Sequence, residues 1–207
     1  MVDVFQAILS DLTMGRSPML SLLESGEINR LVGAIQTCMS SVPISERQEV
    51  AEAAFQMIFH FTHLGSESIR ARLIEVPGLI TSLVLLWGEE ALLKNSQEMV
   101  ANVGRIAFAW SRDSPSRSAA LIEAGWADLI VKALLARPDD KRAVHYVGYA
   151  VYDILFKCSD GWKVAFVAAG AEAALEAAIK RLPRGNNTML CYTKVVNIIH
   201  LLVDQVY

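Results

Sequence analysis

Leu121-Ile122-Glu123-Ala124-Gly125 sets a pattern that three other segments of this 207-residue chain repeat. They read Leu-Leu-Glu-Ser-Gly at 22–26, Leu-Ile-Glu-Val-Pro at 73–77 and Phe-Val-Ala-Ala-Gly at 166–170. Each suits the end of a short amphipathic helix, because apolar residues lead directly to a Gly or Pro that ends it. An apolar stretch follows each one, at 28–35, 79–86, 127–134 and 171–179. The closing Gly or Pro recurs at intervals of 51, 48 and 45 residues, which predicts repeated helical units that stack to share a core.

The spacing of apolar residues favours helices throughout. They recur every three or four residues, as in Ala54, Met57, Ile58 and Phe61, whereas the alternation of a strand is absent over any useful length. We expect Ser116, and either Ser159 or Asp160, to cap the helices that follow them. The charged run 139–142 is expected to be a solvated loop that caps a helix start. The predicted fold class is all-α.

Three groups of residues test this interpretation. The helical periodicity predicts that seven side chains are buried: Ala54, Met57, Ile58, Ile106, Ala107, Val151 and Ile154. Gly26, Gly125 and Gly170 should form tight helix–helix turns. The four Trp residues (87, 110, 126 and 162) are expected to pack at junctions between helices.

Composition excludes several classes of protein. With 53% hydrophobic and 20% charged residues, the chain is not intrinsically disordered. A net charge of −3 argues against a nucleic-acid partner. The longest apolar run, 79–87, is well short of the roughly 20 residues that span a bilayer, so no membrane partner is expected. Cys38, Cys158 and Cys191 are widely spaced, which fits buried thiols in the cytoplasm, or the nucleus, better than a disulfide framework.

The segments 54–61, 103–110 and 147–154 share one apolar pattern. Each of these segments resembles the third helix of the armadillo repeat. The short helix that ends in Gly and the helix after it resemble the first two helices of that repeat. Related repeats such as HEAT share much of the pattern. The resemblance implies a right-handed α-solenoid of about four three-helix repeats. Its single domain, 1–207, would contain a partial unit at 1–16 and units at 17–64, 65–112, 113–158 and 159–207. These units exceed the family's usual ~42 residues, so some links must be expanded.

The resemblance also implies a binding site, because third helices in armadillo-like arrays line a concave groove for a peptide or a partner helix. In nuclear-import adaptors of the family, two groove positions carry Trp and, four residues later, Asn. Here these positions hold Gln56 and His60, then Arg105 and Ala109, then Tyr149 and Asp153, with Asn197 a candidate in the last unit. No unit keeps Trp with Asn, which argues against recognition of basic localisation signals. The implied groove comprises Gln56, His60, Arg105, Tyr149, Asp153 and Asn197, and their mixed charge suggests a protein or peptide partner of mixed charge.

Catalytic motifs are absent from the sequence: it contains no GxGxxG, P-loop, GxSxG or HExxH. His60 and His63 are neighbours on one helical face, but the other two histidines belong to different units, so no metal site is predicted. No catalytic residue and no cofactor is predicted either. The leading hypothesis is a non-enzymatic interaction module or scaffold. The alternative is an all-α enzyme, or enzyme subunit, with an enclosed apolar pocket.

The two ends of the chain carry helices that are apolar around most of their circumference, at 4–12 and 189–203. An uncovered helix of this kind exposes more apolar surface than a monomer usually tolerates. We therefore expect a homo-oligomer, most simply a two-fold dimer through a terminal helix. The alternative is that the chain is one segment of a longer array.

Overall fold

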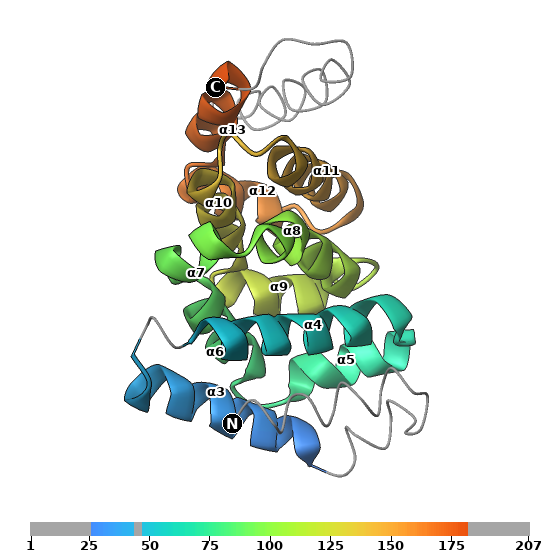
Figure 1. Cartoon of the computed structure of the whole chain (residues 1–207). Helices are drawn as coiled ribbons and strands as arrows, with labels where there is room; N and C mark the ends of the chain where they lie inside the picture. The colour runs from blue at the N-terminus through green and yellow to red at the C-terminus, as the bar shows by residue number, and fades with distance from the viewer. Residues whose placement is uncertain (1–25, 44–46, 182–207) are drawn as a thin grey trace. The chain divides into compact units, whose positions relative to one another are not determined.

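A computed structural model describes residues 26–43 and 47–181 of the chain (Figure 1). Every regular element in these two ranges is an α-helix, and they contain no strand, which confirms the predicted all-α class. The helices are α3 (Glu27–Ser41), α4 (Gln48–Leu64), α5 (Glu67–Glu75), α6 (Leu79–Trp87), α7 (Glu90–Asn95), α8 (Gln97–Ser111), α9 (Pro115–Glu123), α10 (Trp126–Ala136), α11 (Lys141–Lys157), α12 (Gly161–Ala168) and α13 (Ala171–Arg181). The predictions for the terminal helices, for Cys191 and for Asn197 lie outside the described residues.

The chain divides into two compact units, Met1–Asn95 and Ser96–Tyr207. The first contains α3 to α7 and the second contains α8 to α13. None of these described helices is both long and apolar enough to cross a membrane.

The repeated Gly marks a left-handed turn before the second helix of each predicted repeat. Gly26, Gly125 and Gly170 have φ angles of +80°, +89° and +75°, and they directly precede α3, α10 and α13. The fourth segment ends in Pro77, and there the next residue, Gly78, takes the left-handed conformation with φ +76°. Only Gly adopts this conformation without steric cost. The predicted helix–helix turns are confirmed at Gly125 and Gly170, whereas the segment before Gly26 lies outside the described residues.

In the first unit, α6 is buried by its neighbours. It packs against α3, α5 and α7, and six of its nine residues are buried. The indole Nε1 of Trp87 donates a hydrogen bond to the carbonyl oxygen of Ala51 on α4, at 3.3 Å.

Helix α7 was not predicted, and it lies in the link between the second and third helices of the unit 65–112. Because Leu92 and Leu93 of α7 are buried, this expanded link adds to the core.

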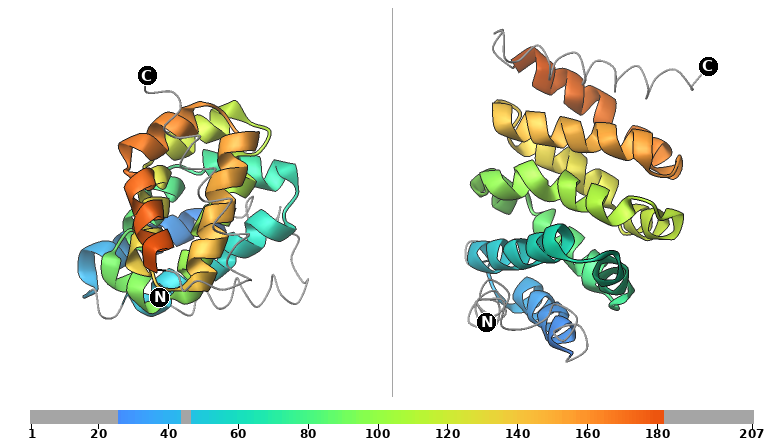
Figure 2. Two further views of the ribbon diagram at one scale, coloured as in Figure 1. Left: turned by 90° about the horizontal axis from the view of Figure 1, so that it is seen from above. Right: turned by 90° about the vertical axis from the view of Figure 1, so that its right-hand side faces the viewer.

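In the second unit, helices with the same place in successive predicted repeats pack against each other. The third helices α8 and α11 are in contact, as are the first helices α9 and α12 and the second helices α10 and α13 (Figure 2). Among the described helices of the first unit, the second helices α3 and α6 pack against each other in the same way. The approach of α8 to α11 is close, because a Cβ added at Gly104 would lie 2.7 Å from the Cβ of Ala150.

The core is the one that the periodicity predicts. All seven predicted side chains are at most 2% exposed, and the four Trp side chains are fully buried. Two of these Trp join neighbouring helices, since the rings of Trp110 on α8 and Trp126 on α10 meet edge to face with centroids 5.5 Å apart. Such pairs add to the stabilisation from area burial.

One helix cap was predicted wrongly. Ser116 lies inside α9, and the cap is Ser114, whose hydroxyl accepts a hydrogen bond from the backbone N–H of Arg117. The reason is Pro115, which suits the first helical position because no backbone N–H is needed there. Asp160 does occupy the N-cap position of α12, without a side-chain hydrogen bond. At the charged run, Asp140 caps α11 as expected and accepts from the N–H groups of Arg142 and Ala143. The run was expected to be a loop throughout, but Lys141 and Arg142 already belong to α11.

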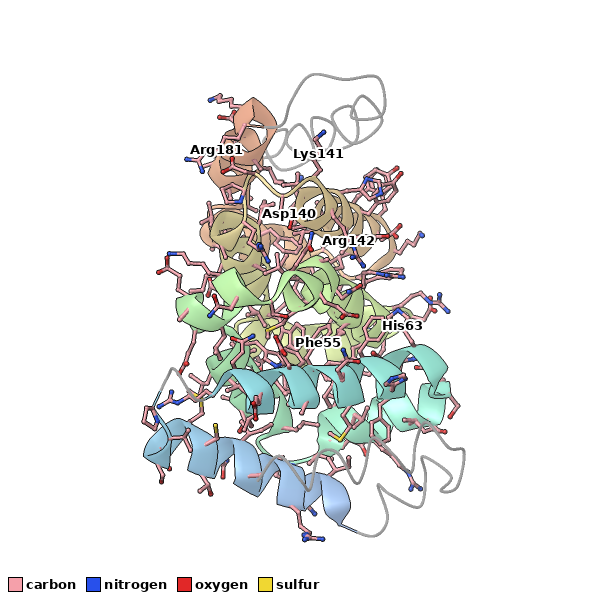
Figure 3. All side chains as sticks on the ribbon, in the orientation of Figure 1. Phe55, His63, Asp140, Lys141, Arg142 and Arg181 are labelled. Atoms are coloured by element: carbon pink, nitrogen blue, oxygen red, sulfur yellow. The ribbon has the colours of Figure 1, made fainter. Side chains whose placement is uncertain are left out.

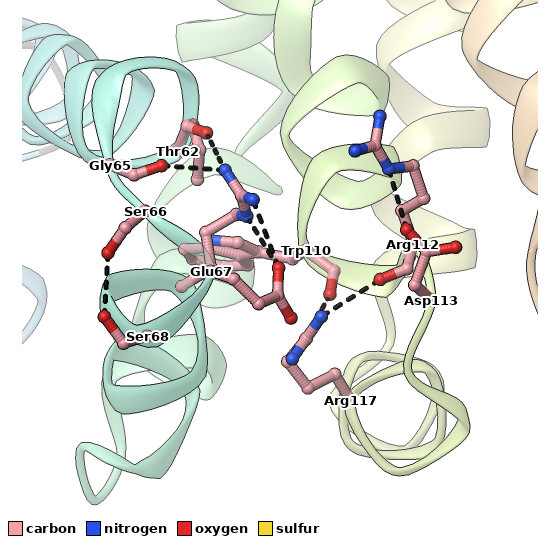
Figure 4. A network of polar contacts seen from close by, with 10 residues as sticks. Thr62, Gly65, Ser66, Glu67, Ser68, Trp110, Arg112, Asp113 and Arg117 are labelled. Atoms are coloured by element: carbon pink, nitrogen blue, oxygen red, sulfur yellow. Dashed lines mark hydrogen bonds and ion pairs between the residues drawn. The ribbon is translucent and has the colours of Figure 1, made fainter.

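Three arginines close the C-terminal ends of long helices, a feature that the sequence analysis did not anticipate. Arg70 Nη1 donates to the carbonyl oxygens of Gly65, at 2.8 Å, and Thr62, at 3.3 Å (Figure 4). Arg117 donates in the same way to the carbonyl oxygens of Trp110, at 2.7 Å, and Arg112, at 3.0 Å. Arg47 donates to Met39 and Val42 at the end of α3 and forms an ion pair with Glu89. Each guanidinium thus satisfies carbonyl groups that a helix terminus leaves unpaired and places a positive charge at the negative end of the helix dipole.

Substitution of these arginines should destabilise the protein. We expect Arg70→Ala and Arg117→Ala each to lower the free energy of unfolding by about 1–2 kcal/mol, because two hydrogen bonds from a charged donor are lost. At Arg117, where Nε and Nη2 each reach one carbonyl, lysine should restore less than half of this loss, since an ammonium group lacks this planar fork. Urea unfolding followed by circular dichroism measures both effects. Lys132→Ala, at an exposed position of α10, is the control, and an equal loss there would contradict the assignment.

Candidate protein-binding surface

The predicted groove residues are distributed over three helices. Gln56 and His60 lie half-buried on α4, four residues apart and so on one face. Arg105 is exposed on α8, while Tyr149 and Asp153 are half-buried on α11. Helix α4 belongs to the first unit and the other two helices to the second, so the row as a whole stays a prediction.

Helix α11 has one buried and one accessible face. Its buried face comprises Ala143, Val144, Val147, Gly148, Ala150, Val151 and Ile154. The other face carries Arg142, His145, Tyr146, Tyr149, Tyr152, Asp153, Phe156 and Lys157, all of them half-buried or exposed. This spacing of three and four residues gathers the aromatic side chains on one side of the helix. Phe156 is 55% exposed and extends the aromatic row to the last turn of the helix.

The neighbouring helix α8 adds to the same surface. The Cζ atom of Arg105 lies 5.4 Å from the centroid of the Tyr146 ring, and that of Arg142 lies 5.8 Å from the same centroid. Arg105 also donates a hydrogen bond to Oδ1 of Asn102, at 3.0 Å. The structure therefore brings Arg105 to Tyr146, a residue outside the predicted groove. Cations held over aromatic faces in this way are attracted by the ring electrons.

Ring contacts continue along α11. The imidazole of His145 lies 5.3 Å from the ring of Tyr146 and 4.6 Å from that of Tyr149, and the rings of Tyr152 and Phe156 are 4.4 Å apart. We call this surface the α8–α11 face. It comprises Asn102, Arg105, Phe108, Arg142, His145, Tyr146, Tyr149, Tyr152, Asp153, Phe156 and Lys157.

The far end of the α8–α11 face combines a cation, an anion and a ring. The ammonium group of Lys157 forms an ion pair with Asp153, at 2.8 Å, and lies 5.4 Å from the centroid of the Phe108 ring on α8. The carboxylate of Asp153 is thus paired with a cation of its own helix. It remains half-buried beside the exposed ring of Phe156.

Several members of this face were missed in the sequence analysis, namely Tyr146, Phe156, Phe108 and Arg142. The resemblance to the armadillo repeat identifies only two groove positions in each repeat, and these four residues occupy neither. A signal was present, because aromatic residues at 145, 146, 149, 152 and 156 are three or four positions apart on the polar side of the helix. What the sequence alone did not provide is the pairing of α8 with α11, which places Arg105 on a ring 41 positions away.

Helix α4 of the first unit carries a shorter aromatic row. The rings of Phe55 and Phe59 are 5.9 Å apart, and the ring of Phe59 stacks on His63 at 4.0 Å. Phe55 is buried and His63 is exposed at the end of the helix (Figure 3). The described part of the chain holds no group of three or more His, Cys, Asp or Glu side chains that could bind a metal ion.

The two described cysteines are not activated thiols. Burial raises the pKa of Cys38. Burial, and then the negative charges of Asp113 and Asp153, raise the pKa of Cys158 to about 11. The thiolate is the nucleophilic form of cysteine, so neither group suits covalent catalysis at neutral pH.

This assignment predicts slow alkylation. At pH 8 we expect Cys158 to react with iodoacetamide about a hundredfold more slowly than an ordinary cysteine, because the raised pKa lowers the thiolate fraction by that factor. The folded state favours the protonated thiol, so its stabilising contribution is complete below the ordinary pKa and is lost as the pH rises through the raised one. Mass spectrometry of digested peptides resolves Cys158 from Cys38 and Cys191. Alkylation as fast as in the urea-unfolded chain would contradict the assignment.

Comparison of the chain with models of known protein families matched none of them, and comparisons with curated proteins and with solved structures gave no significant match. The class of protein therefore follows from the fold itself. Over its described residues the chain is an all-helical protein with an accessible aromatic face on α8 and α11.

Proposed function

We propose that this chain is a non-enzymatic interaction module, built as an armadillo-like stack of helical repeats, whose α8–α11 face binds a protein partner. The observation that carries the proposal is the row of accessible aromatic side chains on α11, held by ring contacts and cations. Partner-binding surfaces are enriched in Tyr, Phe and Arg, and these residues provide most of the binding energy.

The rings of the α8–α11 face are already restrained before any partner binds. His145 contacts two tyrosines, and Tyr152 contacts Phe156. Ordering of side chains is one of the main costs of association, so rings that are held in place bind more favourably than mobile ones. A surface of this kind suits an extended peptide or a helix that lies along α11.

The armadillo-like stack is supported by the packing of equivalent helices, α8 on α11, α9 on α12 and α10 on α13. The right-handed solenoid of about four repeats, and the membership of Gln56, His60 and Asn197 in its groove, stay predictions. A dimer through a terminal helix is part of the same proposal. The raised pKa values of Cys38 and Cys158 give no support to an enzyme that uses these thiols.

Affinity purification with matched baits tests the proposed function. We expect Tyr149→Ala combined with Phe156→Ala to lose specific partners that the wild-type chain retains. The control is Val164→Ala combined with Val167→Ala, which also removes exposed apolar surface, but from α12. Circular dichroism checks that all baits are folded. If the α11 variant retains every partner, the α8–α11 face is not the binding surface.

A further inference from the structure

Two guanidinium groups share one aromatic ring at the end of the α8–α11 face. Arg105 comes from α8 and Arg142 from α11, and both lie within 6 Å of the centroid of Tyr146. The other polar contact of Arg105 is the neutral amide of Asn102. Within the described residues, neither arginine forms an ion pair with a carboxylate. Two positive charges that both lie within 6 Å of one ring centroid make this end of the face attractive to an anion.

The first turn of α11 increases this positive character. Lys141 and Arg142 are its first two residues, and the turn contains no acidic residue (Figure 3). The positive end of the helix dipole lies here, where acidic residues stabilise a helix and cations do not. The carboxylate of Asp140 precedes the turn, but its Oδ1 accepts from two backbone N–H groups and its Oδ2 lies 3.8 Å from Arg137. The charges of this turn therefore do not serve the stability of the helix, and they suit the binding of an anion.

The other end of the face carries exposed aromatic surface beside the ion pair of Asp153 and Lys157. Phe156 is more than half exposed and contacts Tyr152. Arg142 and Phe156 are 14 positions apart, which places them about 21 Å apart along the helix axis at 1.5 Å per residue. An extended segment spans that distance with about six or seven residues.

We propose that the α8–α11 face selects acidic peptide segments. Arg105 and Arg142 bind a Glu or Asp side chain of the partner, and the rings of Tyr149, Tyr152 and Phe156 bind an apolar side chain farther along the same segment. Guanidinium groups suit this task because their planar fork matches a carboxylate. This inference rests on the proposed function and narrows its partner from mixed charge to acidic. Single-stranded nucleic acid is the competing anion, since bases also stack on Tyr and Arg, but the chain's net charge of −3 disfavours it.

Selection from a random 12-residue peptide library displayed on phage, with the full chain as target, tests the inference. The selected peptides should be enriched in Glu and Asp, with an apolar residue about six or seven positions from an acidic one. Fluorescence anisotropy then measures the affinity of the chain for each synthetic peptide and for a neutral counterpart in which every Glu is replaced by Gln and every Asp by Asn. We expect Arg105→Ala combined with Arg142→Ala, and also the neutral peptide, to weaken binding about tenfold or more. Lys132→Ala combined with Arg181→Ala, which removes the same charge from α10 and α13, should leave binding unchanged.

The outcomes separate the inference from the proposed function. Peptides that are neutral or basic, yet lose binding when Tyr149 and Phe156 become alanine, would overturn the inference and leave the proposed function standing. Peptides that depend on neither pair of substitutions, or a selection that enriches nothing, would count against both. Tighter binding of an oligo-dT strand than of any selected peptide, lost in the variant that lacks Arg105 and Arg142, would overturn the acidic-peptide assignment in favour of nucleic acid.

Discussion

Trp110→Ala should lower the free energy of unfolding by about 3–5 kcal/mol, because it removes a large side chain from a core that cannot fully close around the cavity. The side chain is completely buried on α8, and its ring meets Trp126 of α10. Truncation therefore deletes an aromatic contact between two helices together with the apolar area. Denaturant unfolding followed by circular dichroism measures the loss without dependence on Trp fluorescence.

Trp110→Phe provides the matched control. The buried Nε1 of Trp110 has no hydrogen-bond partner among the described residues, so removal of its N–H breaks no hydrogen bond there. We expect a loss of about 1–2 kcal/mol, from the smaller volume alone. A loss from Trp110→Ala no larger than that from Trp110→Phe would contradict the placement of this ring in the core.

The second large effect is a coupling between Gly104 and Ala150. Gly104→Ala adds a Cβ atom that would lie only 2.7 Å from the Cβ of Ala150. Such overpacking lowers the free energy of unfolding by about 1–3 kcal/mol. The gain in helix propensity of Ala over Gly offsets about 1 kcal/mol of this cost. Ala150→Gly alone should cost about 1 kcal/mol through propensity. The double variant exchanges the two residues and should return to within about 1 kcal/mol of the wild type, which gives a coupling energy of about 2 kcal/mol.

Gly33→Ala is the control for this exchange. Gly33 also lies inside a helix, α3, but a Cβ there would meet nothing within 4 Å. The same substitution should therefore stabilise the protein by about 0.5–1 kcal/mol. Additive losses from Gly104→Ala and Ala150→Gly would show that α8 and α11 do not meet at these two residues.

The parts of the fold that could be predicted from sequence are those with local causes. Gly26, Gly125 and Gly170 are required where the backbone turns left-handed, and the core follows from the spacing of apolar residues along each helix. The cap at Ser114 was missed because Pro115 fixes the helix start, which places the cap two residues before the predicted Ser116. Helix α7 was missed because six residues are too few to show a period.

The parts that could not be predicted depend on which helices meet. Arg70 and Arg117 close helix ends that lie five residues or more before them, and the positive charge gives no hint of that role in the sequence. The contact between Arg105 and Tyr146 requires α8 to pack on α11, which in turn needs the small residues Gly104 and Ala150. The family positions identified Arg105, Tyr149 and Asp153. They did not identify the other aromatic rings and cations that complete the α8–α11 face.

Photo-crosslinking tests most directly whether a partner contacts the α8–α11 face. The photoreactive residue p-benzoylphenylalanine replaces Phe156 in one sample and Val164 of α12, which is even more exposed, in another. After irradiation in extract, mass spectrometry identifies the adducts, and an excess of unlabelled wild-type chain shows which of them are specific. The account predicts specific protein adducts at position 156 that are absent at position 164. Specific adducts at 164 alone, or none at 156, would contradict it.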